Sequence, residues 1–394
     1  MLTKETNERL TKVGPGTPMG NLMRRYWHPI ATTTELNREP VMAVRILGEN
    51  LALFRNEKGD LGLVGQRCAH RGCSLAYGIP EDAGLRCPYH GWLYNQEGQV
   101  VEMPSEPATL PVRVSGYPVQ ELGGLIWTYM GPLPAPELPR WDLLVFEDHV
   151  REIMITRLPV NWLQAMENSL DPMHFEHLHN RWGRYVLMRK GGQPMPIMPK
   201  HVKIDFDVFE YGIYKRRLLE GQSEDHDDWK VGHPILFPYT LTLTDLGRPA
   251  LQIRVPVDDE NLLHFWYFAL PAQPGQLPQT EIPVSELPYH DDDGRLIIDN
   301  TKGQDMMAWI TQGSISDRRT EHLVTSDKGV ILYRNLLLEN IEKVERGEDP
   351  LGVIRDPAKN WPMIEIHRET NTGRIAGSSV MPATKELEVG VRGG

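Results

Sequence analysis

The chain has 394 residues and a mass of 45.0 kDa, which predicts two or three domains rather than one small binding module. A formal net charge of −11 argues against a partner held through nucleic-acid phosphates. Residues 1–18 carry charges throughout, and no stretch approaches the roughly 20 apolar residues of a membrane-spanning helix. We therefore expect a cytoplasmic protein that binds neither membranes nor nucleic acids.

The 35 glycines and 32 prolines predict a loop-rich chain with much β structure. In chain order, residues 1–24 are predicted to form an N-terminal helix and arm, and residues 25–135 an all-β domain. Within that domain, apolar runs at 43–47 and 51–55 are separated by Gly-Glu-Asn, which predicts a hairpin. The proline-rich segment 131–139 is typical of a connector between domains.

The second half of the chain changes character, and residues 136–385 are predicted to form a larger α+β domain. Residues 202–208 alternate with the period of a half-buried strand. Apolar residues at three- and four-residue intervals over 330–344 predict an amphipathic helix, with Ser326 as its N-cap. Residues 386–394 are predicted to be a loose tail.

Only three cysteines occur, and all lie within residues 68–87. Three clustered cysteines cannot form a disulfide framework, so they indicate metal binding. One segment reads C-A-H-R-G and the other C-P-Y-H-G-W, and each offers one cysteine and one histidine. Two thiolates and two imidazoles suit a tetrahedral zinc site, and they also suit a 2Fe-2S cluster with two cysteines on one iron and two histidines on the other.

The identities around these donors resemble the cluster-binding signature of Rieske proteins. The ligands that the resemblance implies are Cys68, His70, Cys87 and His90. Respiratory Rieske proteins carry one more cysteine in each loop, and the two form a disulfide. Here Tyr89 stands in the second loop, so Cys73 has no partner and is expected to be a buried apolar residue.

A second group of potential metal ligands lies within residues 171–179. Its members are Asp171, His174, His177 and His179. A non-haem Fe(II) site needs two imidazoles and one carboxylate on a single face. On a regular α-helix His174 shares a face with His177, whereas His179 is rotated by ~140°. Helical geometry therefore favours His177, unless the helix is distorted.

The pattern N-W-x-x-x-x-E-N-x-x-D-x-x-H-x-x-x-x-H resembles the iron motif of Rieske non-haem iron oxygenases, the alpha subunits of aromatic ring-hydroxylating systems. That resemblance implies His174 and His179 as iron ligands. The third ligand would be Asp305, with Asp299 and Asp317 as alternatives. The implied fold class is α+β: an all-β Rieske 2Fe-2S domain and a larger catalytic domain with an antiparallel sheet of the helix-grip (Bet v1-like) type.

Asp171 is a candidate catalytic residue. It precedes His174 by three residues, so a helix would bring its carboxylate to the second N–H of that imidazole. In the family that the chain resembles, the equivalent aspartate links the iron to a Rieske histidine of the neighbouring subunit, which here would be His90. Head-to-tail contacts must close into a ring, so we expect a homotrimer or a dimer of trimers.

The resemblance implies a terminal oxygenase that receives electrons from a separate NAD(P)H-dependent reductase or ferredoxin and oxidises an aromatic substrate with O₂. The segments MGNLMRRYWHP and SDRRTEHLVTSDKGVI resemble the phthalate-dioxygenase-like branch. Within that branch, QAMENSLDP and LLEGQSEDHDDWKVGHP are more similar to the lignin-biaryl O-demethylases. We therefore expect monooxygenation of a methoxylated or carboxylated ring, with cis-dihydroxylation of the phthalate or phenoxybenzoate type as the alternative.

Two further points concern function. A Rieske electron carrier without oxygenase activity would not need residues 140–394 or the second motif. A carboxylate substrate would favour an arginine in the pocket, because the planar guanidinium binds a carboxylate through two parallel hydrogen bonds. Arg254 and Arg216 lie in predicted strands and are the candidate substrate-binding residues.

Overall fold

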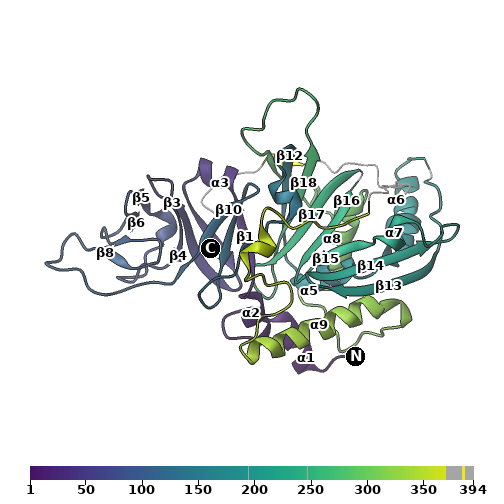
Figure 1. Cartoon of the computed structure of the whole chain (residues 1–394), viewed down its shortest axis with the longest axis horizontal. Helices are drawn as coiled ribbons and strands as arrows, with labels where there is room; N and C mark the ends of the chain where they lie inside the picture. The colour runs from purple at the N-terminus through teal and green to yellow at the C-terminus, as the bar shows by residue number, and fades with distance from the viewer. Residues whose placement is uncertain (194, 246, 370–383, 387–394) are drawn as a thin grey trace.

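The computed structural model describes residues 1–193, 195–245, 247–369 and 384–386. Figure 1 shows a β-rich lobe, which contains the labelled strands β3, β4, β5, β6 and β8, beside a larger lobe built on a broad sheet. Helices and antiparallel strands occur together in the larger lobe, and the expected α+β class is confirmed. None of the helices in these residues is both long and apolar enough to cross a membrane.

Three small sheets make up the β-rich lobe and its junction with the larger lobe. The strands of the junction sheet, in spatial order, are β1 (Trp27–Thr32), β11 (Leu125–Tyr129) and β10 (Val119–Leu122). The second sheet contains β2 (Val41–Ile46), β3 (Glu49–Arg55), β4 (Leu61–Gly65) and β9 (Gly116–Tyr117). The third contains β5 (Ile79–Glu81), β6 (Gly84–Arg86), β7 (Leu93–Tyr94) and β8 (Val100–Glu102). Strands β2 and β3 pair antiparallel and form the predicted hairpin.

The larger lobe is built on a nine-stranded sheet in the order β13-β14-β15-β16-β17-β18-β12-β19-β20. All neighbours are antiparallel except β12 and β19. Strand β18 is buried along eight successive residues, so both of its faces are covered. The strands are β12 (His149–Leu158), β13 (His201–Phe209), β14 (Gly212–Leu219), β15 (His233–Leu236), β16 (Thr240–Asp245), β17 (Arg248–Pro256), β18 (Leu262–Pro271), β19 (Val284–Glu286) and β20 (Lys385–Glu386).

Helices precede the first strand and also lie between the strands of the sheets. Those in the first half are α1 (Lys4–Thr11), α2 (Pro18–Met23), α3 (Thr33–Arg38), η1 (Leu75–Tyr77) and α4 (Asp142–Val145). Those in the second half are α5 (Trp162–Ser169), η2 (Phe175–Trp182), α6 (Gly183–Arg189), α7 (Asp227–Lys230), α8 (Thr301–Thr311), η3 (Thr325–Asp327), α9 (Lys328–Glu345) and α10 (Pro357–Asn360). Figure 1 shows α1 and α2 beside the long α9, so the N-terminal arm packs against a helix of the larger lobe.

The amphipathic helix predicted over 330–344 is confirmed as α9, but its predicted cap is wrong. Ser326 lies in the short 3₁₀ turn η3, and α9 begins two residues later, at Lys328. In that turn the carboxylate of Asp327 accepts a hydrogen bond from the backbone N–H of Val324 at 2.7 Å. The 3₁₀ turn η3, with its own cap, therefore precedes α9, and no side chain of the described residues caps α9 directly. The predicted tail, except for Glu386, lies outside the described residues.

His28, on β1, joins the junction sheet to the large sheet. Its Nε2–H donates to the backbone carbonyl of Met23 at 2.8 Å, and the Tyr239 hydroxyl donates to its Nδ1. Its ring stacks on that of Tyr239, with centroids 5.5 Å apart. Because the side chain is fully buried and both nitrogens are already bonded, burial lowers the pKa of His28 to about 3.

This pKa predicts a loss of stability in mild acid. The unfolded chain binds a proton at His28 below its ordinary pKa of about 6.5, whereas the folded chain does not until about pH 3, so stability present at pH 7 is lost as the pH falls. At pH 5 the expected loss is about 2 kcal/mol. Thermal unfolding of the wild type and of His28→Gln at both pH values checks this. The variant should lose less stability on acidification, and equal losses would contradict the assignment.

Candidate metal centres

Two loops of the β-rich lobe have the same construction and carry the cysteine–histidine pairs. In the first, the Cys68 N–H donates to the backbone carbonyl of Cys73 at 2.9 Å, and the Gly72 N–H donates to the backbone carbonyl of Cys68 at 2.8 Å. In the second, the Cys87 N–H donates to the backbone carbonyl of Trp92 at 2.8 Å, and the Gly91 N–H donates to the backbone carbonyl of Cys87 at 3.1 Å. Each loop turns at a glycine with positive φ, 73° at Gly72 and 74° at Gly91, which other residues adopt only with strain.

The loops bring the four predicted donors to one place. The Cys68 and Cys87 side chains are buried and close enough to interact, while the His70 and His90 rings are exposed with centroids 4.5 Å apart. Burial raises the pKa of the Cys87 thiol to about 11, and a bound cation would favour the thiolate instead. Two inner sulfurs and two outer imidazoles are the donor set that a Rieske cluster requires, so these residues fit it.

Tyr94 contacts the sulfur of Cys68. The Ala69 N–H donates to the Tyr94 hydroxyl at 2.9 Å, so the hydroxyl proton is free to donate to the Cys68 sulfur, 3.1 Å away. A hydrogen bond to a ligand sulfur stabilises its negative charge and raises the reduction potential of a cluster. Cys73 packs against the same small core, but it is half-buried and not fully buried as predicted.

The second site depends on an uncommon helix. Residues Phe175–Trp182 form a π-helix, in which residues five apart lie one above the other. His174 and His179 therefore share a face, as the resemblance implies, and the helix is distorted as that pairing requires. Their ring centroids are 5.0 Å apart, whereas His177 points outward and is exposed.

Helix α8 brings Asp305 to these two histidines. One ligand atom of each residue lies within 4.8 Å of those of the other two. The Asp305 Oδ1 is 3.1 Å from the His179 Nε2 and 3.8 Å from the His174 Nε2. Burial would raise the pKa of Asp305, but the two imidazoles hold it below its ordinary value.

Two of the three ligand candidates accept or donate a hydrogen bond with a neighbouring side chain. The His179 Nδ1–H donates to the Gln304 side-chain oxygen at 3.0 Å, which leaves its Nε2 without a hydrogen-bond partner among the described residues. Asn168, at the end of α5, donates to the Asp305 Oδ1 at 3.2 Å. Two histidines and one carboxylate that converge from one side, with a buried nitrogen left free, fit a mononuclear non-haem iron.

Asp171 lies beside the outer face of this group. Its Oδ1 accepts the Met173 N–H at 2.7 Å, and its Oδ2 is 3.7 Å from the His174 Nδ1. Burial raises the pKa of Asp171, but the His174 imidazole outweighs that effect and lowers it. Its side chain is 30% exposed and that of His174 is 12% exposed, so the carboxylate lies between the imidazole and the protein surface.

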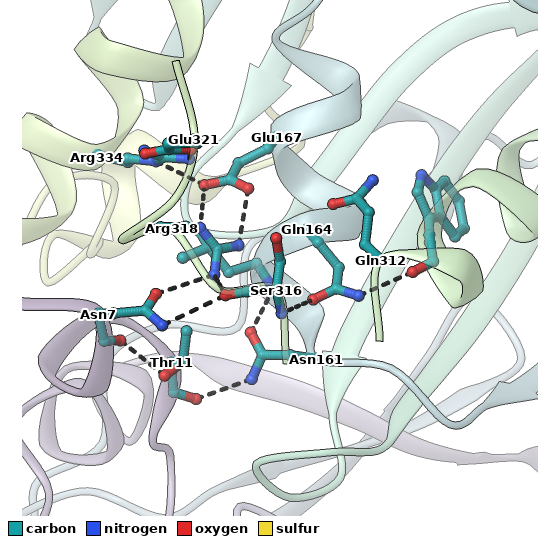
Figure 2. Close-up of polar contacts among 12 residues, drawn as sticks. Asn7, Thr11, Asn161, Gln164, Glu167, Gln312, Ser316, Arg318, Glu321 and Arg334 are labelled. Atoms are coloured by element: carbon teal, nitrogen blue, oxygen red, sulfur yellow. Dashed lines mark hydrogen bonds and ion pairs between the residues drawn. The ribbon is translucent and has the colours of Figure 1, made fainter. Parts of the chain in front are cut away.

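Helix α5 is fixed by a buried ion-pair network that joins distant parts of the chain. Figure 2 shows the Glu167 carboxylate between Arg318 and Arg334, at 2.7 and 2.6 Å. Arg318 also reaches the Asn7 side chain of α1 at 3.2 Å. Gln164 donates to the Trp309 backbone carbonyl on α8, at 2.9 Å. The helix that leads into the ligand segment is therefore locked to α1, α8 and α9.

The alternative ligands lie elsewhere. Asp299 pairs with Lys190 at 2.7 Å, and Asp317 pairs with Arg319 at 2.8 Å, both near the surface. Neither belongs to the group that surrounds Asp305.

The two candidate substrate arginines differ in position. Arg254 is only 1% exposed, donates to Ser169 and Gln252, and lies 5.2 Å from the Trp309 ring centroid. Arg216 is not brought to the metal group. It pairs with Asp207 at 2.5 Å and donates to three backbone carbonyls at the end of α7.

Three residues that contact the candidate metal ligands were not identified from the sequence: Tyr94, Asn168 and Gln304. Asn168 stands in the quoted motif, and Gln304 is next to Asp305, so both had a sequence signal. Tyr94 had none, because its contact depends on how β7 crosses behind the first loop.

Comparison with known proteins agrees with this geometry. Residues 26–119 match the family described as Rieske [2Fe-2S] domain, and residues 296–366 match the family described as LigXa C-terminal domain like. The 5,5′-dehydrodivanillate O-demethylase oxygenase subunit of Sphingobium sp. (strain NBRC 103272 / SYK-6) is 43% identical over 380 residues, 94% of this chain and 88% of the relative. The phenoxybenzoate dioxygenase subunit alpha of Ectopseudomonas oleovorans is 33% identical over 88% of this chain and 87% of its own.

Among solved structures, that of Pseudomonas putida CBB5 NdmA superposes with a TM-score of 0.61 at 21% identity. The match covers 84% of this chain and 94% of that one, and it supports the fold. The two sequence relatives each span most of both chains at 33% identity or more, which is enough to assign the family. The chain therefore belongs to the Rieske non-haem iron oxygenases, as an oxygenase subunit with a 2Fe-2S cluster and a mononuclear iron.

Proposed function

We propose that this oxygenase removes the methyl group from a methoxylated aromatic acid related to 5,5′-dehydrodivanillate. The observation that carries the proposal is the convergence of His174, His179 and Asp305 in a chain that is 43% identical to an O-demethylase oxygenase subunit. The overall reaction would be ArOCH₃ + O₂ + NAD(P)H + H⁺ → ArOH + HCHO + H₂O + NAD(P)⁺. One oxygen atom enters the methyl carbon, and the hydroxylated carbon then leaves as formaldehyde.

We propose that Cys68, His70, Cys87 and His90 hold the cluster and that His174, His179 and Asp305 hold the iron. When bound, the cluster would supply single electrons and the iron would activate O₂. The chain's own contributions are positional: Gln304 fixes the tautomer of His179, and Asn168 orients Asp305.

We also propose that residues 25–135 are the cluster domain, that 136–385 are the catalytic domain, and that the chain assembles as a homotrimer or a dimer of trimers. In this assembly Asp171 would connect His174 to His90 of a neighbouring subunit. Its partial exposure and its contact with the His174 Nδ1 support that role. A separate reductase or ferredoxin would deliver the electrons from NAD(P)H, and the cytoplasm is the proposed location.

The reaction type can be tested by product analysis. With a reductase, NADH and 5,5′-dehydrodivanillate, we expect one formaldehyde and one new phenol for each O₂ consumed, because the methoxy carbon is the oxidised atom. Formaldehyde assay, oxygen uptake and mass spectrometry measure these quantities. A product that keeps its methoxy groups and gains two oxygen atoms would instead support the dioxygenase alternative, which the phenoxybenzoate relative favours.

The iron ligands can be tested by metal analysis. His179→Ala should lose the mononuclear iron and keep the cluster, so the iron content should fall from three to two per chain while the visible spectrum persists. His177→Ala is the matched control, because that side chain is exposed, and it should keep all three irons. Three irons in His179→Ala would reassign the ligand.

The bridging role can be tested at Asp171. Asp171→Asn should keep three irons per chain but turn over about 10- to 100-fold more slowly, because the amide is a poorer partner for the His174 N–H. Asp299→Asn is the control, since its carboxylate pairs with Lys190 near the surface. In single-turnover experiments that start from the reduced cluster, the cluster should be reoxidised more slowly in the Asp171 variant but not in the Asp299 control. An unchanged rate would remove Asp171 from the electron path.

A further inference from the structure

Strand β14 presents positive charge to the iron site. Residues alternate between the two faces of a strand, so Lys215 and Arg217 share one face while Arg216 lies on the other. The inner face packs against the π-helix. The Lys215 Nζ is 5.7 Å and the Arg217 Cζ is 4.9 Å from the centroid of the Phe175 ring.

Phe175 separates these cations from the candidate iron ligands. Its ring centroid is 4.6 Å from that of His174 and 5.1 Å from that of His179. Lys215 is also close enough to influence the pKa of both Asp171 and His179. The ammonium group therefore lies one aromatic ring away from the metal group.

The neighbouring arginines are already occupied. Arg217 pairs with Asp228 at 3.2 Å, and Asp228 in turn lies 3.2 Å from His233. Arg254 uses its terminal nitrogens on Ser169 and Gln252, and its Nε has no hydrogen-bond partner among the described residues. The Arg217 charge is thus paired, and the terminal nitrogens of Arg254 are hydrogen-bonded.

Lys215 is different. Its backbone pairs with β13 and β15, and it is 4% exposed, yet within the described part of the chain its ammonium group forms no hydrogen bond and no ion pair. The carboxylates of Asp171 and Glu369 are near enough to favour its charged form, but among the described residues neither forms an ion pair with it. Burial, reinforced by Arg217, outweighs them and lowers the pKa of Lys215 to about 7. A buried ammonium without a directly paired carboxylate is unfavourable, and an incoming carboxylate would supply that contact.

We propose that Lys215 is the specificity-determining residue for the substrate, and that it binds the carboxylate of an aromatic acid beside Phe175. This inference rests on the proposed function and adds the residue by which the site would select an anionic rather than a neutral methoxyarene. With the carboxylate at Lys215, the ring extends past Phe175 toward His174, His179 and Asp305. Lysine suits this task because its compact ammonium can meet one carboxylate without the second planar contact that arginine needs.

The test compares two probes on the anaerobic holoenzyme by calorimetry: 5,5′-dehydrodivanillate and its dicarboxamide, which keeps the phenols and loses both carboxylates. Lys215→Met should weaken binding of the acid by about 10- to 100-fold and leave the dicarboxamide unchanged. Lys215→Arg should keep the preference for the acid. Lys203→Met makes the same substitution on β13, where the ammonium pairs with Glu224 at 2.6 Å near the surface, and should change neither affinity.

A second readout separates ligand recognition from a structural role. Without substrate, Lys215→Met should keep three irons and unfold at the same or a higher temperature, because it removes an unpaired buried charge. A lower unfolding temperature together with equal weakening of both probes would overturn the inference. Wild-type enzyme that demethylates the acid and the dicarboxamide with equal KM would overturn the inference and leave the proposed function intact. Failure of the wild type to bind or demethylate either probe would overturn both.

Discussion

The architecture of the larger lobe depends on one constraint: two imidazoles and a carboxylate must meet in one largely buried place while the His179 Nε2 stays without a hydrogen-bond partner among the described residues. Buried polar atoms without partners are costly, so such a group persists only when the surrounding structure holds it. The Glu167 ion pairs meet this requirement, because they fix α5 against α1, α8 and α9. The N-terminal arm therefore stabilises a site that it never touches.

Charge in this lobe is divided between two uses. Around Glu167 every cation has a carboxylate partner, which makes a rigid joint between helices. Around Phe175 the positive charge exceeds what the nearby carboxylates pair with, since Lys215 has no such partner among the described residues. The charges around Glu167 are paired, whereas the Lys215 charge beside the metal group is not paired within the residues that the structure describes. We expect this distribution when one part of a lobe is structural and another part binds a ligand.

How far the sequence predicts this molecule depends on the range of each interaction. The cysteine–histidine loops and the hairpin of β2 and β3 are local, and their spacing alone indicates them. The pairing of His174 with His179 could not be derived from helical periodicity, because it requires a π-helix that no local pattern announces. Asp305 lies far along the chain, and only the family resemblance pointed to it. Arg216 illustrates a different limit: a shift of one residue along a strand reverses the face, and the inward cation is Lys215.

The π-helix also bears on how such a site can arise and be redesigned. Two ligands five residues apart in a π-helix occupy the relation that residues four apart hold in an α-helix, so the two arrangements differ by a single inserted residue. His177 is exposed and lies between the two ligands, which makes it the residue whose removal changes the fewest contacts. A chain that lacks it could keep the same ligand face on an ordinary helix. The sequence spacing of the two histidine ligands can thus change through the insertion or deletion of one residue as well as through substitution of a ligand.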